Sequence, residues 1–347
     1  MPIFRPHARR IFCAAVSLLT VLISSVCWAE TPITASPAVE IAYDTKPGTF
    51  YQLQVHRDGT WENLGVAVKG TGEKHRRFIP SGEYRVITPS NTWALVWADE
   101  FDGDGLDYSK WEKEENNYGG GNYERQAYRT DPKYCVVKDG VLQLSVYRDP
   151  HTTSDGKTQP YSSARLRTRK RGDWTFGRFE IRAKMPDGQG IWPAVWLLPT
   201  DSPYGGWAAG GEIDIIESRG SAVHETTGAL HFGGPWPRNT HLAHAYPFPK
   251  TNAAEDFHLY ALEWNADEIS WFVDGKLCQT RTKDEWFSEA ARTNPSAPFD
   301  QPFHLIVNVA VDGRFFENTD QQADRLPNSA FPQTLEVDFI RVYQWAE

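Results

Sequence analysis

Three acidic residues lie within six positions, in the segment Glu212-Ile213-Asp214-Ile215-Ile216-Glu217. Hydrolysis of a glycosidic bond needs two carboxyl groups, one ionised as a nucleophile and one kept protonated as a general acid. Three carboxyl groups on one face would separate their pKa values in this way, because like charges and burial raise the pKa of at least one member. The third acid would orient its neighbour and share a proton with it. The segment is therefore a candidate site for glycoside hydrolysis.

The segment has the composition of a β-strand, and a regular strand would not bring the three acids together. Alternation of side chains puts Glu212 and Asp214 on one face and Glu217 on the other. One extra residue at Ile215 or Ile216, a β-bulge, returns Glu217 to the face of the other two acids. The Cα atoms of Glu212 and Glu217 would then be about 13 Å apart, and inward-leaning side chains could reach the ~5–5.5 Å of retaining glycosidases. We therefore predict a bulge, and the spacing permits a retaining mechanism.

The acidic pattern is short, so its surroundings decide how it is interpreted. An E-x-D-x-x-E match is expected by chance in roughly one chain in ten to twenty of this length, and acids on the solvated face of an edge strand are the alternative. The segments Gly205-Gly206-Trp207 and Gly210-Gly211 precede the acids, and residues 192–199 hold two tryptophans four positions apart. These flanking residues favour a functional site over acids that merely lie on the solvated face of an edge strand.

With further segments, these motifs resemble glycoside hydrolase family 16, specifically its laminarinase-like (endo-β-1,3-glucanase) branch. The matching segments cover nearly the whole C-terminal domain: residues 97–101, 176–180, 192–199, 211–217, 228–234, 260–264 and 337–343. The resemblance implies an all-β fold, a β-jelly-roll sandwich with a sugar-binding cleft on its concave sheet. It also implies that Glu212 is the nucleophile, Asp214 its assistant and Glu217 the general acid/base.

Five other residues match positions at which the family contacts the sugar. The resemblance implies that two tryptophans stack on or flank the sugar near the cleavage point, that an asparagine and an arginine bind sugar hydroxyls, and that a histidine lies near the acid/base. The tryptophans are Trp192 and Trp196, the asparagine is Asn122, the arginine is Arg165 and the histidine is His231. Core packing is the alternative for the tryptophans and the histidine.

A structural calcium site is the one metal site that the resemblance implies. Its ligands would be Glu100, the carbonyl group of Gly140 and Asp338, on the convex side of the sandwich. Hard oxygen ligands of this kind suit Ca²⁺. No cofactor is expected for catalysis.

Residues 1–29 are expected to form a signal peptide. Three arginines precede a mostly apolar stretch, residues 11–26, and cleavage is expected before Glu30. The apolar stretch is shorter than the ~20 residues of a membrane span, and no other segment is apolar enough to cross a membrane. A lipoprotein modified at Cys27 is a disfavoured alternative, since a branched residue precedes the cysteine. We expect a secreted or periplasmic protein.

The remaining chain is expected to contain a linker and two folded parts. After the linker, residues 30–37, short strand-like runs separated by turn residues predict a small accessory β module at residues 38–90, with a sugar-binding module as the alternative. Residues 91–347 would form the catalytic domain. There, residues 178–184 alternate between apolar and charged side chains and residues 304–311 are almost continuously apolar, which favours an antiparallel sandwich over an α/β barrel.

The charge of the chain limits its partners. The formal net charge is −9, and loss of the signal peptide's three arginines gives −9 − 3 = −12. Such a chain is a poor partner for nucleic acid and suits a substrate without strong negative charge. We expect a monomer that binds a β-glucan polysaccharide. Of the two cysteines that remain, Cys135 and Cys278, both are expected to be buried thiols, with a disulfide as the alternative.

Three positions depart from the family pattern. Phe176 stands where the family more often has tyrosine, Asp312 where it often has glycine, and Arg314-Phe315-Phe316 where a tryptophan is common. These loops would shape the distal subsites, so the exact linkage preference stays open.

The leading hypothesis is endo-hydrolysis of β-1,3-glucan, with mixed β-1,3/1,4-glucan as a further substrate. The extra residue in Ile215-Ile216 argues against the branch of lichenases and xyloglucan enzymes, whose strand is one residue shorter. One alternative is an agarase or carrageenase, the latter needing many cations around its sulfated substrate. The other is a β-glucan recognition protein that does not cleave; such relatives lose one or more acids, and this chain keeps all three.

Overall fold

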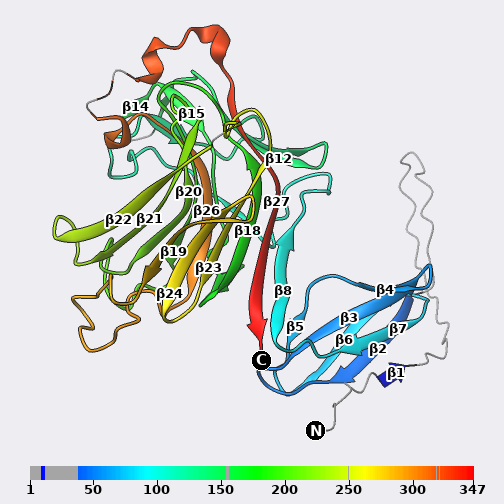
Figure 1. The fold of residues 1–347 in the computed structure, drawn as a ribbon. Coiled ribbons are helices and arrows are strands. Elements are labelled where there is room, and N and C mark those ends of the chain that lie inside the picture. Colours follow the sequence, from blue (N-terminus) through cyan, green and yellow to red (C-terminus); the bar gives the residue numbers. More distant parts are fainter. Residues whose placement is uncertain (1–8, 12–37, 154–155, 249, 318, 320) are drawn as a thin grey trace, which may run out of the picture. The chain divides into compact units, whose positions relative to one another are not determined.

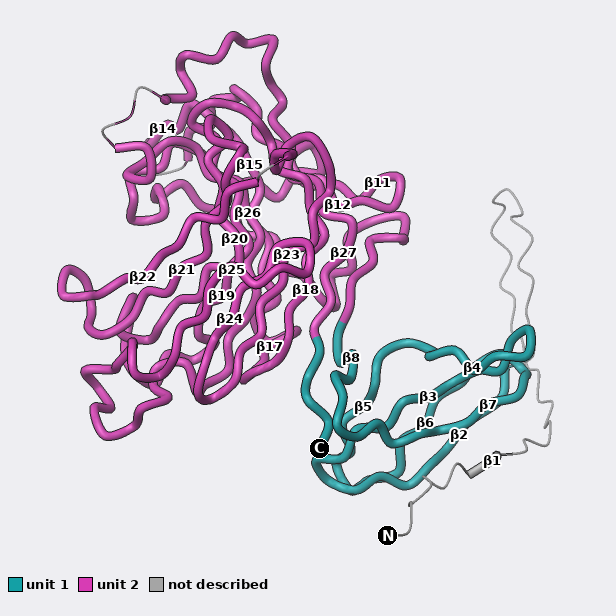
Figure 2. The backbone as a smooth tube through the Cα atoms, viewed as in Figure 1, with its two compact units in different colours: residues 1–97, 343–347 teal, residues 98–342 magenta. Residues whose placement is uncertain are grey.

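The computed structural model describes residues 9–11, 38–153, 156–248, 250–317, 319 and 321–347, and these form two compact units (Figure 1). One unit is made of residues 1–97 and 343–347, and the other of residues 98–342 (Figure 2). The predicted boundary after residue 90 falls inside the first unit. Apart from residues 9–11, the predicted signal peptide lies outside the described residues, as does the predicted linker.

The first unit is a small β structure with its own core. Its strands are β1 (Arg9–Ile11), β2 (Ala38–Asp44), β3 (Phe50–Arg57), β4 (Thr60–Asn63), β5 (Val68–Lys69), β6 (Lys74–Pro80), β7 (Tyr84–Ile87) and the first part of β8 (Thr92–Asp99). Strand β3 pairs with β4, β5 and β7, and β2 pairs with β6. The turn Asp58-Gly59, with φ of 48° and 83°, joins β3 to β4 in a tight hairpin. Its core side chains are Ile41, Leu53, Val55, Ile79 and Tyr84.

The second unit contains the sheet that carries the three acids, here called the acid-bearing sheet. In spatial order its strands are β22 (Asn239–Pro247), β21 (Glu225–Gly233), β20 (Glu212–Glu217), β19 (Ile191–Pro199), β26 (Phe303–Val311), β16 (Arg165–Arg167) and β9 (Glu112–Lys113), with β17 (Asp173–Trp174) also paired to β26. Every residue of β26 is buried, as its almost continuously apolar sequence predicts.

A second sheet packs behind the acid-bearing sheet (Figure 1). Its strands, in spatial order, are β11 (Cys135–Lys138), β12 (Val141–Val146), β27 (Gln333–Ala346), β18 (Gly177–Lys184), β23 (His258–Trp264), β24 (Glu268–Val273) and β25 (Lys276–Thr282), and β8 also pairs with β27. In β18 the apolar residues Phe179, Ile181 and Ala183 are fully buried and alternate with partly exposed ones. This alternation places one face of the sheet in the core and the other towards solvent.

Short elements complete the second unit. They are the paired strands β10 (Gln126–Tyr128) and β15 (Tyr161–Ser163), the hairpin β13 (His151–Thr152) and β14 (Thr158–Gln159), and the 3₁₀ helices η1 (Arg314–Phe316), η2 (Ala323–Arg325) and η3 (Asn328–Ala330). The prediction of an all-β jelly-roll sandwich with a small N-terminal β module is confirmed. Among the described residues, helices of a length and hydropathy suited to crossing a membrane are not found.

Neither of the two cysteines outside the predicted signal peptide forms a disulfide. Cys135 is buried and Cys278 is partly exposed, and both thiols are free. Burial raises the pKa of each thiol to about 11, so both stay protonated and unreactive at neutral pH. The expectation of two thiols is confirmed, although only one of them is fully buried.

Candidate active site

Strand β20 contains the predicted bulge. Between Asp214 and Glu217 it advances three residues while its neighbour β21 advances two, from Ala229 to Thr227. On the other side, Ile216 and Asp214 pair with the consecutive residues Val195 and Trp196 of β19. Ile215 therefore has no partner in β19 and is the extra residue of the bulge.

The bulge brings the three acids to one face of the sheet. Glu217 pairs with Ala194 and Asp214 with Trp196, two residues that are two positions apart on β19 and so point to the same side. Ile215 is only 4% exposed, as expected for a side chain on the core side. The prediction that a bulge at Ile215 or Ile216 makes the acids converge is confirmed.

Two indole N–H groups bind the two glutamates. Trp207 Nε1 donates to Glu212 Oε2 over 2.8 Å, and Trp192 Nε1 donates to Glu217 Oε1 over 2.9 Å. An N–H donor stabilises the ionised form of a carboxyl group and fixes the direction of its oxygens. Trp192 was predicted at the site from the sequence. Trp207 was recognised only as part of a flanking glycine-rich motif, because its contact depends on how the loop before β20 folds back.

His231 lies between the first two acids. Its Nε2 is 3.6 Å from Glu212 Oε1 and 3.4 Å from Asp214 Oδ2. It projects from β21 directly opposite Glu212 in the pairing of the strands. The sequence placed this histidine near the acid/base, and the structure places it nearer Glu212 and Asp214.

Burial dominates the electrostatics of the three carboxyl groups. The pKa of each is raised to about 8, chiefly because burial removes water from the charged form, and the charge of Asp214 adds to the effect on Glu212 and Glu217. For Glu212 and Glu217, His231 and the indole N–H groups act in the opposite direction. The cluster therefore keeps at least one proton at neutral pH, as a site with one acid and one nucleophile requires.

The second sheet supports the acid strand from behind. Trp271, on β24, donates its Nε1 hydrogen to the backbone carbonyl of Asp214 over 2.8 Å, and this indole is buried. Sequence reasoning did not assign this tryptophan, because its partner is a backbone atom on another sheet. The contact fixes β20 next to its bulge.

Trp196 lies on β19, next to the acid strand, and Arg165 lies on β16, beyond β26 in the same sheet. The Arg165 guanidinium is 4.8 Å from the centre of the Trp196 ring, and Trp196 Nε1 donates to Asn308 Oδ1 over 2.6 Å. Arg165 is almost fully buried, and its Nε is 3.0 Å from Glu114 Oε2. The structure thus brings both predicted residues to the acid-bearing face and adds Asn308 and Glu114.

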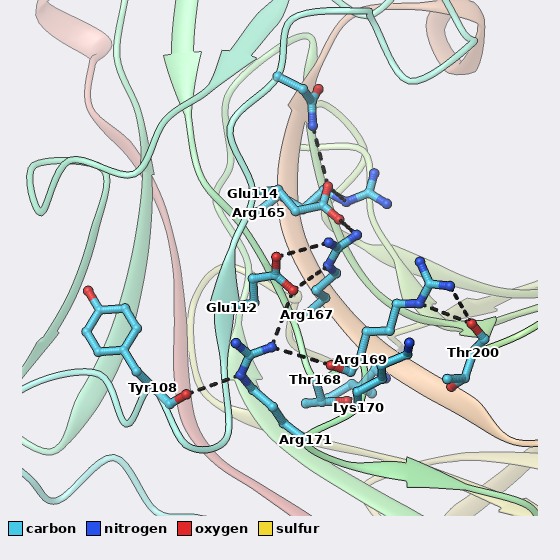
Figure 3. Close-up of polar contacts among 12 residues, drawn as sticks. Tyr108, Glu112, Glu114, Arg165, Arg167, Thr168, Arg169, Lys170, Arg171 and Thr200 are labelled. Carbon is cyan, nitrogen blue, oxygen red and sulfur yellow. Dashed lines mark hydrogen bonds and ion pairs between the residues drawn. The ribbon is translucent and has the colours of Figure 1, made fainter.

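Acids pair with Arg165, Arg167 and Arg171 at this end of the sheet (Figure 3). Arg167 binds Glu112 through two nitrogens at 3.0 and 3.1 Å and binds Glu114 at 2.7 Å. Arg171 also contacts Glu112, at 3.4 Å, and Arg169 donates to the carbonyl of Thr200. The arginines of β16 could bind an anionic ligand as far as the sequence shows, but in the structure they are paired with glutamates of the protein itself.

Asn122 lies in the loop between β9 and β10, whereas the other predicted sugar-binding residues lie on strands of the acid-bearing sheet. Its side chain makes a weak contact of 3.4 Å with Glu124, and its carbonyl accepts the backbone N–H of Arg314 over 2.8 Å. It belongs to a loop joined to the loop after β26, where Glu124 and Asp312 form a β-bridge. Its predicted role in binding sugar hydroxyls stays a prediction.

The two carboxylates of the predicted calcium site each have another partner. Both oxygens of Glu100 bind the guanidinium of Arg341, at 2.8 and 2.7 Å, and Asp338 binds Arg182 over 2.6 Å. A calcium ion would have to displace both arginines, so this arrangement does not fit the ion as it stands. The calcium site stays a prediction, and a fall in melting temperature on chelation with EDTA would support it.

Comparison with known proteins agrees with this geometry. Residues 122–326 match the sequence profile of glycosyl hydrolases family 16. The β-sandwich of this chain, with its carboxyl groups on one bulged strand, is therefore the fold of a glycoside hydrolase. The chain belongs to glycosyl hydrolase family 16, which confirms the resemblance seen in its motifs.

Three similar proteins extend the comparison. A glucan endo-1,3-beta-glucosidase A1 of Niallia circulans is 42% identical over 262 residues, which cover 72% of this chain and 38% of that protein. A beta-glucanase of Rhodothermus marinus is 41% identical over 267 residues, 74% of this chain and 86% of the relative. The catalytic domain of an endo-1,3-beta-glucanase (laminarinase) from Thermotoga petrophila has a similar structure, with a TM-score of 0.64 and 35% identity, covering 74% of this chain and all of that one. The chain therefore spans well under half the length of the Niallia protein.

Proposed function

We propose that the protein is an endo-acting hydrolase of β-1,3-glucan, also active on mixed β-1,3/1,4-glucan, that works by retaining double displacement. The observation that carries the proposal is the bulge at Ile215, because it puts Glu212 and Glu217 on one face with Asp214 between them. The relatives named as glucan endo-1,3-beta-glucosidase, beta-glucanase and laminarinase support the choice of glucan.

In the first step, Glu212 attacks the anomeric carbon while Glu217 donates a proton to the leaving oxygen. The bond from the anomeric carbon to that oxygen breaks as the ester bond to Glu212 forms. Glu212 suits the ionised role because His231 Nε2 lies 3.6 Å from its Oε1 and the Trp207 N–H binds its other oxygen. Burial and the nearby Asp214 raise the pKa of Glu217 to about 8 against the opposing influence of His231, Trp192 and Arg219, so Glu217 can hold a proton at neutral pH.

In the second step, water hydrolyses the glycosyl ester. Glu217, now ionised, takes a proton from the water, whose oxygen attacks the anomeric carbon and releases Glu212. Asp214 and His231 lie beside Glu212 and are placed to share a proton with it as its charge changes. No cofactor takes part in either step of this proposal.

A neutral glucan fits the charges around the site better than a sulfated galactan. The arginines of β16 are bound to Glu112 and Glu114, and Arg169 just beyond the strand is bound to a backbone carbonyl, so sulfate groups would compete with partners already in place. The negative net charge of −9 also disfavours a polyanion. These points favour a glucanase over a carrageenase, and the three retained acids favour an enzyme over a recognition protein.

We also propose that the protein is exported and acts as a monomer. The proposal of export rests on the basic and apolar residues of positions 1–29. Expression in a bacterial host followed by N-terminal analysis of the exported protein tests it. A mature chain that begins close to Glu30 supports export, and an intact N-terminus in the cytoplasm contradicts it.

The function is tested by incubating the protein with laminarin, lichenan, agarose and carrageenan and measuring reducing ends. We expect rapid release from laminarin, release from lichenan, and none from the two galactans. Glu212→Gln serves as the matched control and should be inactive on all four. Release from agarose or carrageenan with none from either glucan would contradict the proposal.

A further inference from the structure

A chain of side-chain contacts forms an arch over the two glutamates. One foot is Trp207, which binds Glu212, and the other is Trp192, which binds Glu217. Trp207 contacts Trp236, Trp236 contacts Arg314, and Phe315, the next residue in the chain, stacks on Trp192. We call these five residues the aromatic arch. Because its feet are bound to the two glutamates, the arch borders the place that a sugar between Glu212 and Glu217 would occupy.

The two halves of the arch come from opposite ends of the strands. Trp207 precedes β20 and Trp236 follows β21, so both belong to loops at the Glu212 end. Arg314 and Phe315 follow β26, whose last residue, Val311, pairs with Ile191 at the Trp192 end of β19. The contact between Arg314 and Trp236 therefore crosses the acid-bearing face of the sheet.

The feet of the arch are firmly held. The Phe315 ring stacks on Trp192 with 4.4 Å between ring centres and 16° between planes, and the Arg219 guanidinium covers Phe315 at 4.1 Å. On the other half, the backbone N–H of Trp236 donates to the carbonyl of Trp207 over 3.3 Å. Each half of the arch is thus held by contacts of its own that do not depend on the contact between Arg314 and Trp236.

The junction between the halves is an exposed cation–π contact. The Arg314 guanidinium is 5.3 Å from the centre of the Trp236 ring and 4.8 Å from that of Tyr123. Trp236 is 58% exposed and Tyr123 is 74% exposed, so this is the most solvent-accessible part of the arch. Contacts of this kind are weak at exposed sites, so the arch can open at Arg314 without disturbing the core.

We propose that Arg314 determines which glucans the enzyme accepts, by closing the arch over the sugars next to the scissile bond. An unsubstituted β-1,3-glucan lies beneath the closed arch. A glucosyl branch on one of those sugars would occupy the position of the guanidinium and hold the junction open, so the branched chain loses the Arg314–Trp236 contact. Arg314 is thus a specificity-determining residue that discriminates linear from branched glucan. This inference rests on the proposed glucanase function.

The test compares Arg314→Ala with the parent on two substrates of equal length. One is a linear β-1,3-gluco-oligosaccharide, and the other carries a single β-1,6-linked glucosyl branch at an internal sugar. We expect Arg314→Ala to raise the ratio of kcat/KM for branched over linear substrate by roughly two- to fivefold, the value that corresponds to one exposed cation–π contact. Arg57→Ala is the matched control, since Arg57 is a 61% exposed arginine of the other unit.

A second variant separates the contact from a general effect of the mutation. Trp236→Ala should raise the same ratio, and adding it to Arg314→Ala should raise the ratio no further, because either change opens the same junction. An unchanged ratio in both single variants would overturn the inference. If the parent cleaves no linear glucan, the proposed function fails as well, whereas cleavage with an unchanged ratio contradicts the role of Arg314 alone.

Discussion

Glu212 and Glu217 have the same side chain and opposite tasks in the proposed reaction, so their surroundings must separate them. Glu212 is buried and Glu217 is partly buried, and the loss of water around each raises the pKa of both. Only Glu212 has His231 within 3.6 Å of its oxygens, in addition to an indole N–H. The spacing of the acids together with the flanking motifs was enough to predict the acids, but the contact of Trp207 with Glu212 could not be predicted, because it is set by a loop.

Loss of the Trp207 N–H should shift the acid limb of the pH–rate profile. In Trp207→Phe the ring stays and the donor is lost, so the ionised form of Glu212 loses a hydrogen bond and its pKa rises. We expect the acid limb of kcat/KM to move to higher pH by about one unit. A profile identical to that of the parent would contradict this role of Trp207.

The buried acids should also cost the protein stability at high pH. Glu217 has a pKa of about 8 in the folded protein and an ordinary value of 4.5, so between these pH values the folded state binds a proton that the unfolded state lacks. Stability therefore falls as the pH rises through this window. Glu217→Gln lacks the ionising group and should be more stable than the parent at pH 8, by about 1–3 kcal/mol. Urea unfolding at pH 4 and pH 8 measures this, and an equal difference at both pH values would contradict it.

At the scale of the elements, the bulge determines where the acid/base points. Its existence could be predicted, because alternation in a regular strand puts Glu217 on the wrong face. Its position could not, since Ile215 and Ile216 are alike and only pairing with β19 identifies Ile215 as the extra residue. The loop contacts that form the aromatic arch were beyond prediction too, because they join segments far apart in the sequence through exposed side chains.

Deletion of Ile215 gives a direct test of the bulge. Without it the strand reads Glu-Ile-Asp-Ile-Glu, in which regular alternation keeps the three acids on one face and Glu217 keeps its pairing with Ala194. We expect the deletion to cost about 100-fold in kcat through misplacement, against more than about 1,000-fold for Glu217→Gln. Equal losses in the two variants would contradict the assignment of Ile215. Circular dichroism checks that both are folded.

Asp312, which departs from the family pattern, connects the loop after β26 to two other segments through its carboxylate. It is 1% exposed and has φ of 57°, a conformation in which glycine is the usual residue. Its carboxylate accepts the N–H of Ala323 over 2.7 Å and binds Arg125 over 3.0 Å. Asp312→Ala leaves both donors without this partner and should destabilise the protein by about 1–3 kcal/mol, measured by urea unfolding. A change below about 0.5 kcal/mol would contradict this role.

At the scale of the whole molecule, the acidic chain is suited to an uncharged polysaccharide. The second unit carries the site, while the first unit has a separate core and no cluster of acids, histidines or cysteines suited to metal binding among its described residues. The composition shows that the whole chain is acidic. It could not show that Glu112 and Glu114 neutralise the arginines of β16, because those residues are about 50 positions apart in the chain.

Salt should therefore have little effect on turnover of laminarin. Ions screen interactions between charges, and an uncharged substrate has none to screen. We expect kcat/KM to change less than about twofold between 20 and 500 mM sodium chloride. A steep fall would indicate that the natural substrate is a charged glycan.

The most direct measurement of the central claim is to trap the covalent intermediate. A β-1,3-linked gluco-oligosaccharide with fluorine at position 2 of the reacting sugar and a good leaving group should react with the enzyme and be released slowly, because fluorine destabilises both transition states. Peptide mapping by mass spectrometry locates the label. A glycosyl ester on Glu212 is the predicted result, and it should be absent from Glu212→Gln. A label on Glu217, or no label while the probe's leaving group is released continuously, would contradict the account.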